Sequence, residues 1–66
     1  MYEFILDRKG ELLSVHSMKE YAEFLDISLS FLCQLLNGKK YTTKHLAYAI
    51  SQYANGELEY YFKGVE

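Results

Sequence analysis

Apolar and polar residues alternate at the beginning of the chain. The alternation covers residues 2–6 and again 11–15, which is the period of a strand with one buried face. Between the two runs lie Asp7 and Gly10, residue types that bond or relax the backbone of a tight turn. The pattern therefore predicts an antiparallel β-hairpin over residues 1–16.

The next stretch has the spacing of two short helices joined by a tight turn. Ser17 and Glu20 have the separation of a capping box, in which each side chain bonds a free backbone N–H at a helix start. Ser28 is suited to cap a second helix, and Gly38 is suited to end it, because glycine accepts the left-handed conformation. We therefore predict two consecutive helices within residues 17–37.

The pattern in the last third of the chain predicts one more helix and then a strand. Thr43 can cap a helix that continues to a glycine stop, over residues 43–55. In residues 57–63 apolar and polar positions alternate, although the segment also fits one short helical turn. We prefer the strand, because a third strand would support the hairpin. The expected fold class is mainly α with a small antiparallel sheet (α+β), in a single domain covering residues 1–66.

Composition indicates a small folded domain without covalent or metal cross-links. Half of the residues are hydrophobic and 11 are aromatic, too many for a disordered segment of 66 residues. One cysteine allows no disulfide framework, and His16 and His45 do not have metal-ligand spacing. No catalytic constellation stands out, so we expect no enzyme activity, no metal and no cofactor. The absence of a long apolar run and of a signal peptide predicts a cytoplasmic protein without a membrane partner.

Charge is distributed unevenly along the chain. The formal net charge is −2, but residues 27–56 contain three lysines and no acid, and the remainder has four basic residues against nine acidic ones. A local charge of +3 beside −5 provides a basic surface on an acidic body. This arrangement is compatible with binding to a polyanion through one part of the chain.

Spacing within residues 17–55 resembles the helix-turn-helix of the Cro/repressor family, also called lambda-repressor-like, whose members include small phage and plasmid regulators. The resemblance covers a little over half of the chain. It consists of a small residue in the first helix, a turn residue four positions later, buried aliphatic residues ten and thirteen positions on, then Asn-Gly and basic residues. In this chain those places are held by Ala22, Asp26, Leu32, Leu35, Asn37-Gly38 and Lys39-Lys40.

The resemblance implies a sequence-specific DNA-binding transcriptional regulator with a three-helix core. Its second helix, about Ser28 to Asn37, would enter the major groove of a double-stranded operator, with two copies forming a homodimer on a near-palindromic site. The implied base-reading residues are Ser28, Leu29, Ser30, Cys33 and Gln34. The implied phosphate-binding residues are Asn37, Lys39, Lys40, Tyr41, Thr43 and Lys44.

Several positions depart from the family pattern and support an alternative. Asp26 stands where glycine is usual, and a hairpin is expected in place of the family's initial helix. The second helix is unusually apolar at Leu29, Phe31 and Cys33. Exposed apolar side chains more often mark a protein contact than a base reader. The alternative is therefore an antirepressor or modulator that binds a protein, such as a cognate repressor, through Leu29 and Phe31, unless both residues belong to the core.

Overall fold

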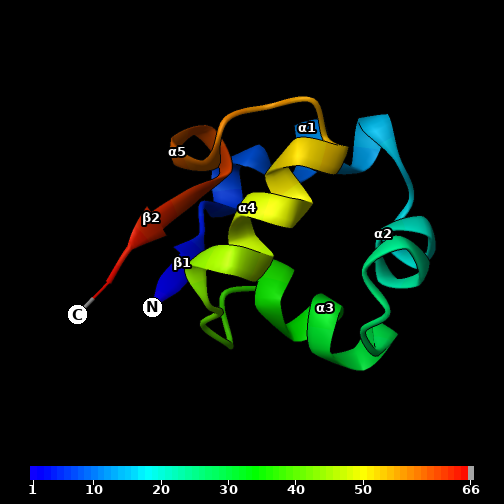
Figure 1. Cartoon of the computed structure of the whole chain (residues 1–66), viewed down its shortest axis with the longest axis horizontal. Helices are drawn as coiled ribbons and strands as arrows, with labels where there is room; N and C mark the ends of the chain where they lie inside the picture. The colour runs from blue at the N-terminus through cyan, green and yellow to red at the C-terminus, as the bar shows by residue number, and fades with distance from the viewer. Residues whose placement is uncertain (66) are drawn as a thin grey trace.

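Two short strands from opposite ends of the chain pair with each other and close the fold. The computed structural model describes residues 1–65, and within them the strands form a two-stranded antiparallel sheet in which Phe4 lies opposite Phe62. Both chain ends therefore lie side by side (Figure 1). The elements in chain order are β1 (Tyr2–Phe4), a 3-10 turn η1 (Leu6–Arg8), α1 (Lys9–Val15), α2 (Met18–Leu25), α3 (Leu29–Leu36), α4 (Lys44–Tyr53), α5 (Leu58–Tyr61) and β2 (Phe62–Gly64).

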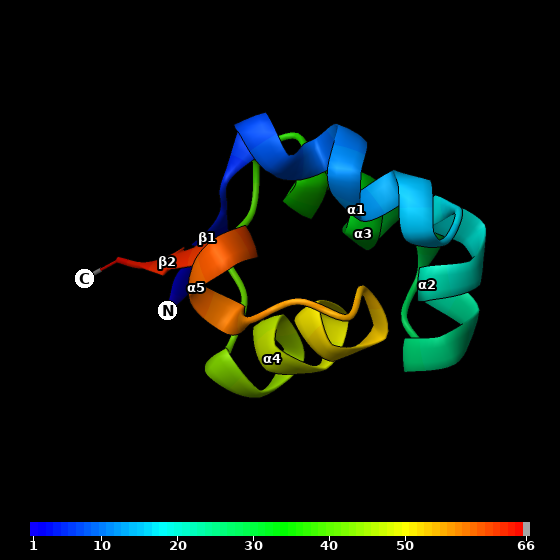
Figure 2. The same cartoon turned by 90° about the horizontal axis from the view of Figure 1, so that it is seen from above.

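The helices surround one apolar core. Helix α4 lies in the middle of the view, with α3 below it, α2 on one side and the strands on the other (Figure 1). Seen at right angles, α1 and α4 lie on opposite sides of the molecule (Figure 2). Both strands and each of the five helices contribute buried apolar side chains: Phe4, Leu12, Tyr21, Ala22, Leu32, Leu35, Leu36, Ala47, Ile50, Leu58, Tyr61 and Phe62. Within residues 1–65 no helix has the length and apolar character needed to cross a membrane.

Side-chain caps explain where the three central helices begin. The Ser17 hydroxyl accepts from the Glu20 N–H at 3.1 Å, and the Ser17 N–H donates to the Glu20 carboxylate at 2.8 Å, which is a complete capping box. The Ser28 and Thr43 hydroxyls accept from N–H groups three residues later, at 3.0 and 3.2 Å. The helices expected within residues 17–37 and 43–55 are therefore confirmed.

The predicted N-terminal hairpin is wrong. Residues 11–15 belong to helix α1, and the strand partner of β1 is β2 from the other end of the chain. Five residues of alternation are too few to separate a strand from a helix, and Leu12, which the strand pattern placed on the polar side, is fully buried. Gly10 lies inside the helix instead of in a left-handed turn. A helix therefore does precede α2, which removes one departure from the family pattern.

The predicted C-terminal strand is only partly right. Residues 58–61 form the short helix α5, and the strand begins at Phe62. Leu58 and Tyr61 are three residues apart and both buried, which is helical spacing. Their burial outweighs the alternating pattern, so the one helical turn left open in the sequence is what forms. The strand then pairs directly with β1 in a two-stranded sheet, so among the described residues it does not act as a third strand beside a hairpin.

Candidate nucleic-acid interface

Helices α2 and α3 are consecutive and joined by a sharp turn. Asp26 adopts the left-handed conformation, with φ of 54°, and ends α2. The Ile27 N–H then donates to the Ala22 carbonyl at 3.1 Å, which turns the chain back over the end of α2. Ala22 is small and 93% buried, and Leu32 is fully buried, so the two helices cross closely at these residues. The contact fixes α3 through one side only.

The opposite side of α3 is open to solvent. We define the α3 outer face as the exposed residues Ser28, Leu29, Ser30, Cys33 and Gln34. The inner side is formed by Leu32, Leu35 and Leu36, each fully buried. The residues that the sequence proposed for base reading therefore lie together, on one exposed helix face, and the structure places no other element over them within residues 1–65.

The two apolar residues proposed for a protein contact differ in exposure. Leu29 is 49% exposed, at the first position of α3. Phe31 is half-buried and packs against the core. Its neighbour one turn later on the same face is the buried Leu35, so Phe31 borders the inner side of the helix. Leu29 is therefore the residue of this pair with the larger exposed surface, about half of it, to contact a partner.

An exposed basic segment follows α3. Lys39, Lys40, Tyr41, Thr43 and Lys44 are all exposed. The Lys39 N–H donates to the Gln34 carbonyl at 2.9 Å, which holds the segment against the last turn of α3. Further along, Thr42 is buried, and its N–H and carbonyl both pair with Tyr2 of β1 at 2.8 Å. Lys39 and Lys40 thus lie in a segment whose two ends are held in place by backbone hydrogen bonds.

Asn37 and Lys9 meet at the C-terminal end of α3. The Lys9 ammonium donates to the Asn37 side-chain carbonyl oxygen, with a distance of 2.6 Å between Nζ and Oδ1. The Asn37 side-chain amide in turn donates to the Cys33 sulfur at 3.4 Å. Sequence reasoning missed Lys9, because it placed this residue in a hairpin turn and counted it with the acidic part of the chain. A helix prediction for residues 9–15 would have been needed to find it.

Charges are polarised along α3. Lys9, Lys39 and Lys40 lie near its C-terminal end. Asp26 lies three residues before its first residue, Leu29, and Glu23 lies in the last turn of α2. Both carboxylates are exposed. These side-chain charges attract an anion to the C-terminal end of the α3 outer face. At the other end the two carboxylates oppose the partial positive charge of the α3 N-terminus, which itself attracts anions.

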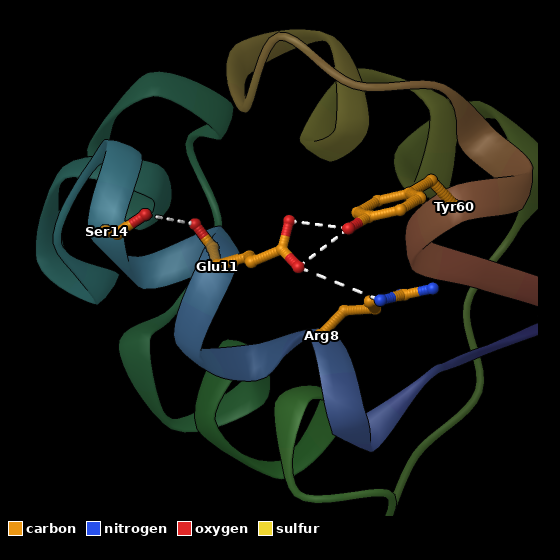
Figure 3. A network of polar contacts seen from close by, with 4 residues as sticks. All are labelled: Arg8, Glu11, Ser14 and Tyr60. Atoms are coloured by element: carbon orange, nitrogen blue, oxygen red, sulfur yellow. Dashed lines mark hydrogen bonds and ion pairs between the residues drawn. The ribbon is translucent and has the colours of Figure 1, made fainter.

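A polar network at another place in the fold has a structural explanation. The Tyr60 hydroxyl donates to the Glu11 carboxylate at 2.6–2.7 Å, and Arg8 lies 3.7 Å from Glu11 and 4.0 Å above the Tyr60 ring (Figure 3). The hydrogen bond to Glu11 raises the pKa of Tyr60. The three side chains thus connect η1 and α1 to α5, with the Arg8 Nε buried and without a hydrogen-bond partner among the described residues. The network therefore holds two distant segments of the chain together.

Known proteins offer no function to transfer to this chain. Comparisons with protein-family models, with curated proteins and with solved structures found no match. Within residues 1–65 no group of three or more His, Cys, Asp or Glu residues is placed to hold a metal ion. Cys33 is a free thiol, and His16 packs its ring edge-to-face against Tyr21 and Phe24. The α3 outer face and the lysines beside it are therefore the surface features that can serve to bind a partner.

Proposed function

We propose that the protein is a sequence-specific DNA-binding regulator of the Cro/repressor type, with α2 and α3 as its helix-turn-helix. The observation that carries this proposal is the open outer face of a helix whose inner face is fully buried. A helix fixed from one side can enter the major groove without rearranging the fold. The neighbouring lysines supply the phosphate contacts that such docking requires.

Each residue type on the α3 outer face matches a group in the major groove. Gln34 has a side-chain amide that can bond the N6 and N7 edge of adenine in two places. Ser28 and Ser30 can bond bases or phosphate, and the exposed Leu29 can pack against a thymine methyl group. Lys39, Lys40 and Lys44 would lie along the phosphate backbone. Gln34 is therefore the residue most directly tied to base choice.

The size of α3 favours a dimer on DNA. Eight helical residues at about 1.5 Å each span about 12 Å, which covers roughly four base pairs at 3.4 Å per step. So short a half-site distinguishes few DNA sequences, and a second copy of the protein would double the number of base pairs that are read. We therefore propose a homodimer whose two α3 helices read half-sites with centres about 34 Å apart.

Binding to a randomised pool of labelled duplexes tests the proposal. Fluorescence anisotropy between 50 and 200 mM salt should show affinity falling steeply, with a log–log slope at least as steep as about −2.7 per protomer, because Lys39, Lys40 and Lys44 contribute about −0.9 each. Selection from the pool should yield a preferred sequence. Gln34→Ala should relax that preference at one position, whereas Gln52→Ala, an exposed glutamine of α4, should leave it unchanged. Absent or salt-insensitive binding to every duplex would contradict the proposal.

Exposure of Leu29 favours one alternative, a modulator of the same fold that binds a protein. An apolar side chain beside Asp26 suits a partner surface that combines an apolar pocket with basic residues, such as the DNA-binding surface of a cognate repressor. Under this alternative the chain binds no duplex, and Leu29→Ser abolishes binding to the purified repressor while the variant stays folded. Duplex binding by the wild-type chain, or unchanged repressor binding by a folded Leu29→Ser variant, would contradict this alternative.

A further inference from the structure

The side chain of Lys9 crosses from α1 to the end of α3. Its ammonium meets Asn37, which lies 28 residues further along the chain. Asn37 is the residue that ends α3, and the other polar group of its side chain is bonded to Cys33, one turn earlier on the same helix. Because the bond from the Asn37 amide to Cys33 lies within α3, it fixes the orientation of the Asn37 side chain on that helix. The position of the Lys9 ammonium is then fixed relative to the α3 outer face.

The charge of Lys9 is not neutralised by an ion pair. Among residues 1–65 the side-chain ion pairs join Arg8 to Glu11 and Lys63 to Glu3. An ammonium has three N–H donors, and Asn37 is a neutral acceptor that uses one of them. Lys9 therefore retains a full positive charge and donors to offer, beside the last turn of α3.

We propose that Lys9 is a phosphate-binding residue of the DNA interface, and that Asn37 is a positioning residue that holds the Lys9 ammonium there. The proposal rests on the proposed function of the α3 outer face. It also changes the role of Asn37, which the sequence assigned to direct phosphate binding. Lys9, Lys39, Lys40 and Lys44 then form the phosphate-binding set, all drawn from residues that flank α3 on its C-terminal side.

Lys9→Met tests the first half of this proposal, because methionine keeps the apolar stem and removes the charge. The salt slope of duplex binding should weaken by about 0.9 per protomer, so for each protomer bound the affinity ratio of wild type to variant shrinks about 3.5-fold between 50 and 200 mM salt. Base preference should stay unchanged. Arg8→Met is the matched control: it removes one charge from the adjacent residue, whose side chain faces Tyr60 and α5 (Figure 3). It should leave the salt slope unchanged, and Lys9→Arg should restore it.

A double-mutant cycle tests the role of Asn37. Asn37→Ala should weaken both affinity and salt slope in the wild-type background and neither in the Lys9→Met background, because its effect passes through Lys9. Thermal unfolding of each variant, read by circular dichroism, verifies that the fold is retained. An Asn37→Ala effect of equal size in both backgrounds would overturn the positioning role.

The outcomes separate this inference from the proposed function. Suppose that wild type binds duplex DNA and that Lys9→Met and Arg8→Met both keep the affinity and salt slope of wild type. Lys9 then makes no phosphate contact, and the inference alone fails. If Lys9→Met lowers thermal stability and leaves the slope intact, Lys9 only complements the partial negative charge at the end of α3, and the inference again fails. If wild type binds no duplex, the proposed function falls and this inference with it.

Discussion

Truncation of Leu32 and of Leu29 to alanine should have very different effects, although both residues are leucines of α3. Leu32 is fully buried at the crossing with α2, whereas Leu29 is 49% exposed. Removing a buried leucine side chain costs about 2–5 kcal/mol, because transfer free energy is lost and a cavity remains. Removing a half-exposed one forfeits about half of a transfer term and leaves no closed cavity, about 1 kcal/mol or less.

The total stability makes this difference easy to measure. A chain of 66 residues at about 0.05–0.15 kcal/mol per residue has an unfolding free energy of roughly 3–10 kcal/mol. Leu32→Ala should therefore remove a large share of it, and each kcal/mol lowers Tm by about 4–8 °C in a domain of this size. Urea unfolding gives the unfolding free energy of each variant and thermal unfolding gives its Tm, both followed by circular dichroism. Equal losses in the two variants would refute the assignment of the inner and outer sides of α3.

Three further predictions concern the caps, a buried tyrosine and the turn. Ser17→Ala should lower the unfolding free energy by about 1 kcal/mol through loss of the capping box, whereas Ser14→Ala, whose hydroxyl only bonds the carbonyl of its own helix, should change it by less than about 0.5 kcal/mol. Burial raises the pKa of Tyr21 from 10.0 to about 12, so the unfolded chain loses this proton first, and stability should fall as pH rises from about 10 to 12. Tyr21→Phe should lack that part of the fall. The pKa values of Tyr60 and Tyr61 are raised as well, so an ultraviolet titration of wild type should show several late tyrosines, and Tyr21→Phe should show one fewer. Asp26→Gly should raise the unfolding free energy by up to about 1 kcal/mol in urea unfolding, because the left-handed φ of 54° is unstrained for glycine; a loss of stability would show that the Asp26 side chain contributes to the turn.

Local signals in the sequence predicted the central helices correctly. Ser17, Ser28 and Thr43 each cap a helix within their own three or four residues, so the information needed to place these helix starts is local. The positions of Ala22 and Leu32 at the helix crossing followed from the resemblance to the Cro/repressor helix-turn-helix. The same resemblance implied the five exposed residues of the α3 outer face, whereas Phe31, also expected to face outward, is half-buried.

Local sequence patterns did not predict the pairing of strands that are distant in the sequence. The partner of β1 lies about 60 residues away in the sequence, at the other end of the chain, and alternation in residues 11–15 suggested a nearer one. With that segment placed in a strand, the contact between Lys9 and Asn37 was not predictable, because it depends on α1 being a helix beside α3. The half-burial of Phe31 likewise depends on how the rest of the core covers α3.

The most direct test of the account is a map of where DNA contacts the protein. Amide chemical shifts of the ¹⁵N-labelled chain should be recorded by NMR while a duplex chosen from the randomised pool is added. We predict that the largest changes fall on residues 28–34 and 39–44, with a further change at Lys9 and small changes in β2 and α5. Changes concentrated on β2 and α5, or none at saturating duplex, would contradict the assignment of the α3 outer face as the DNA-binding surface.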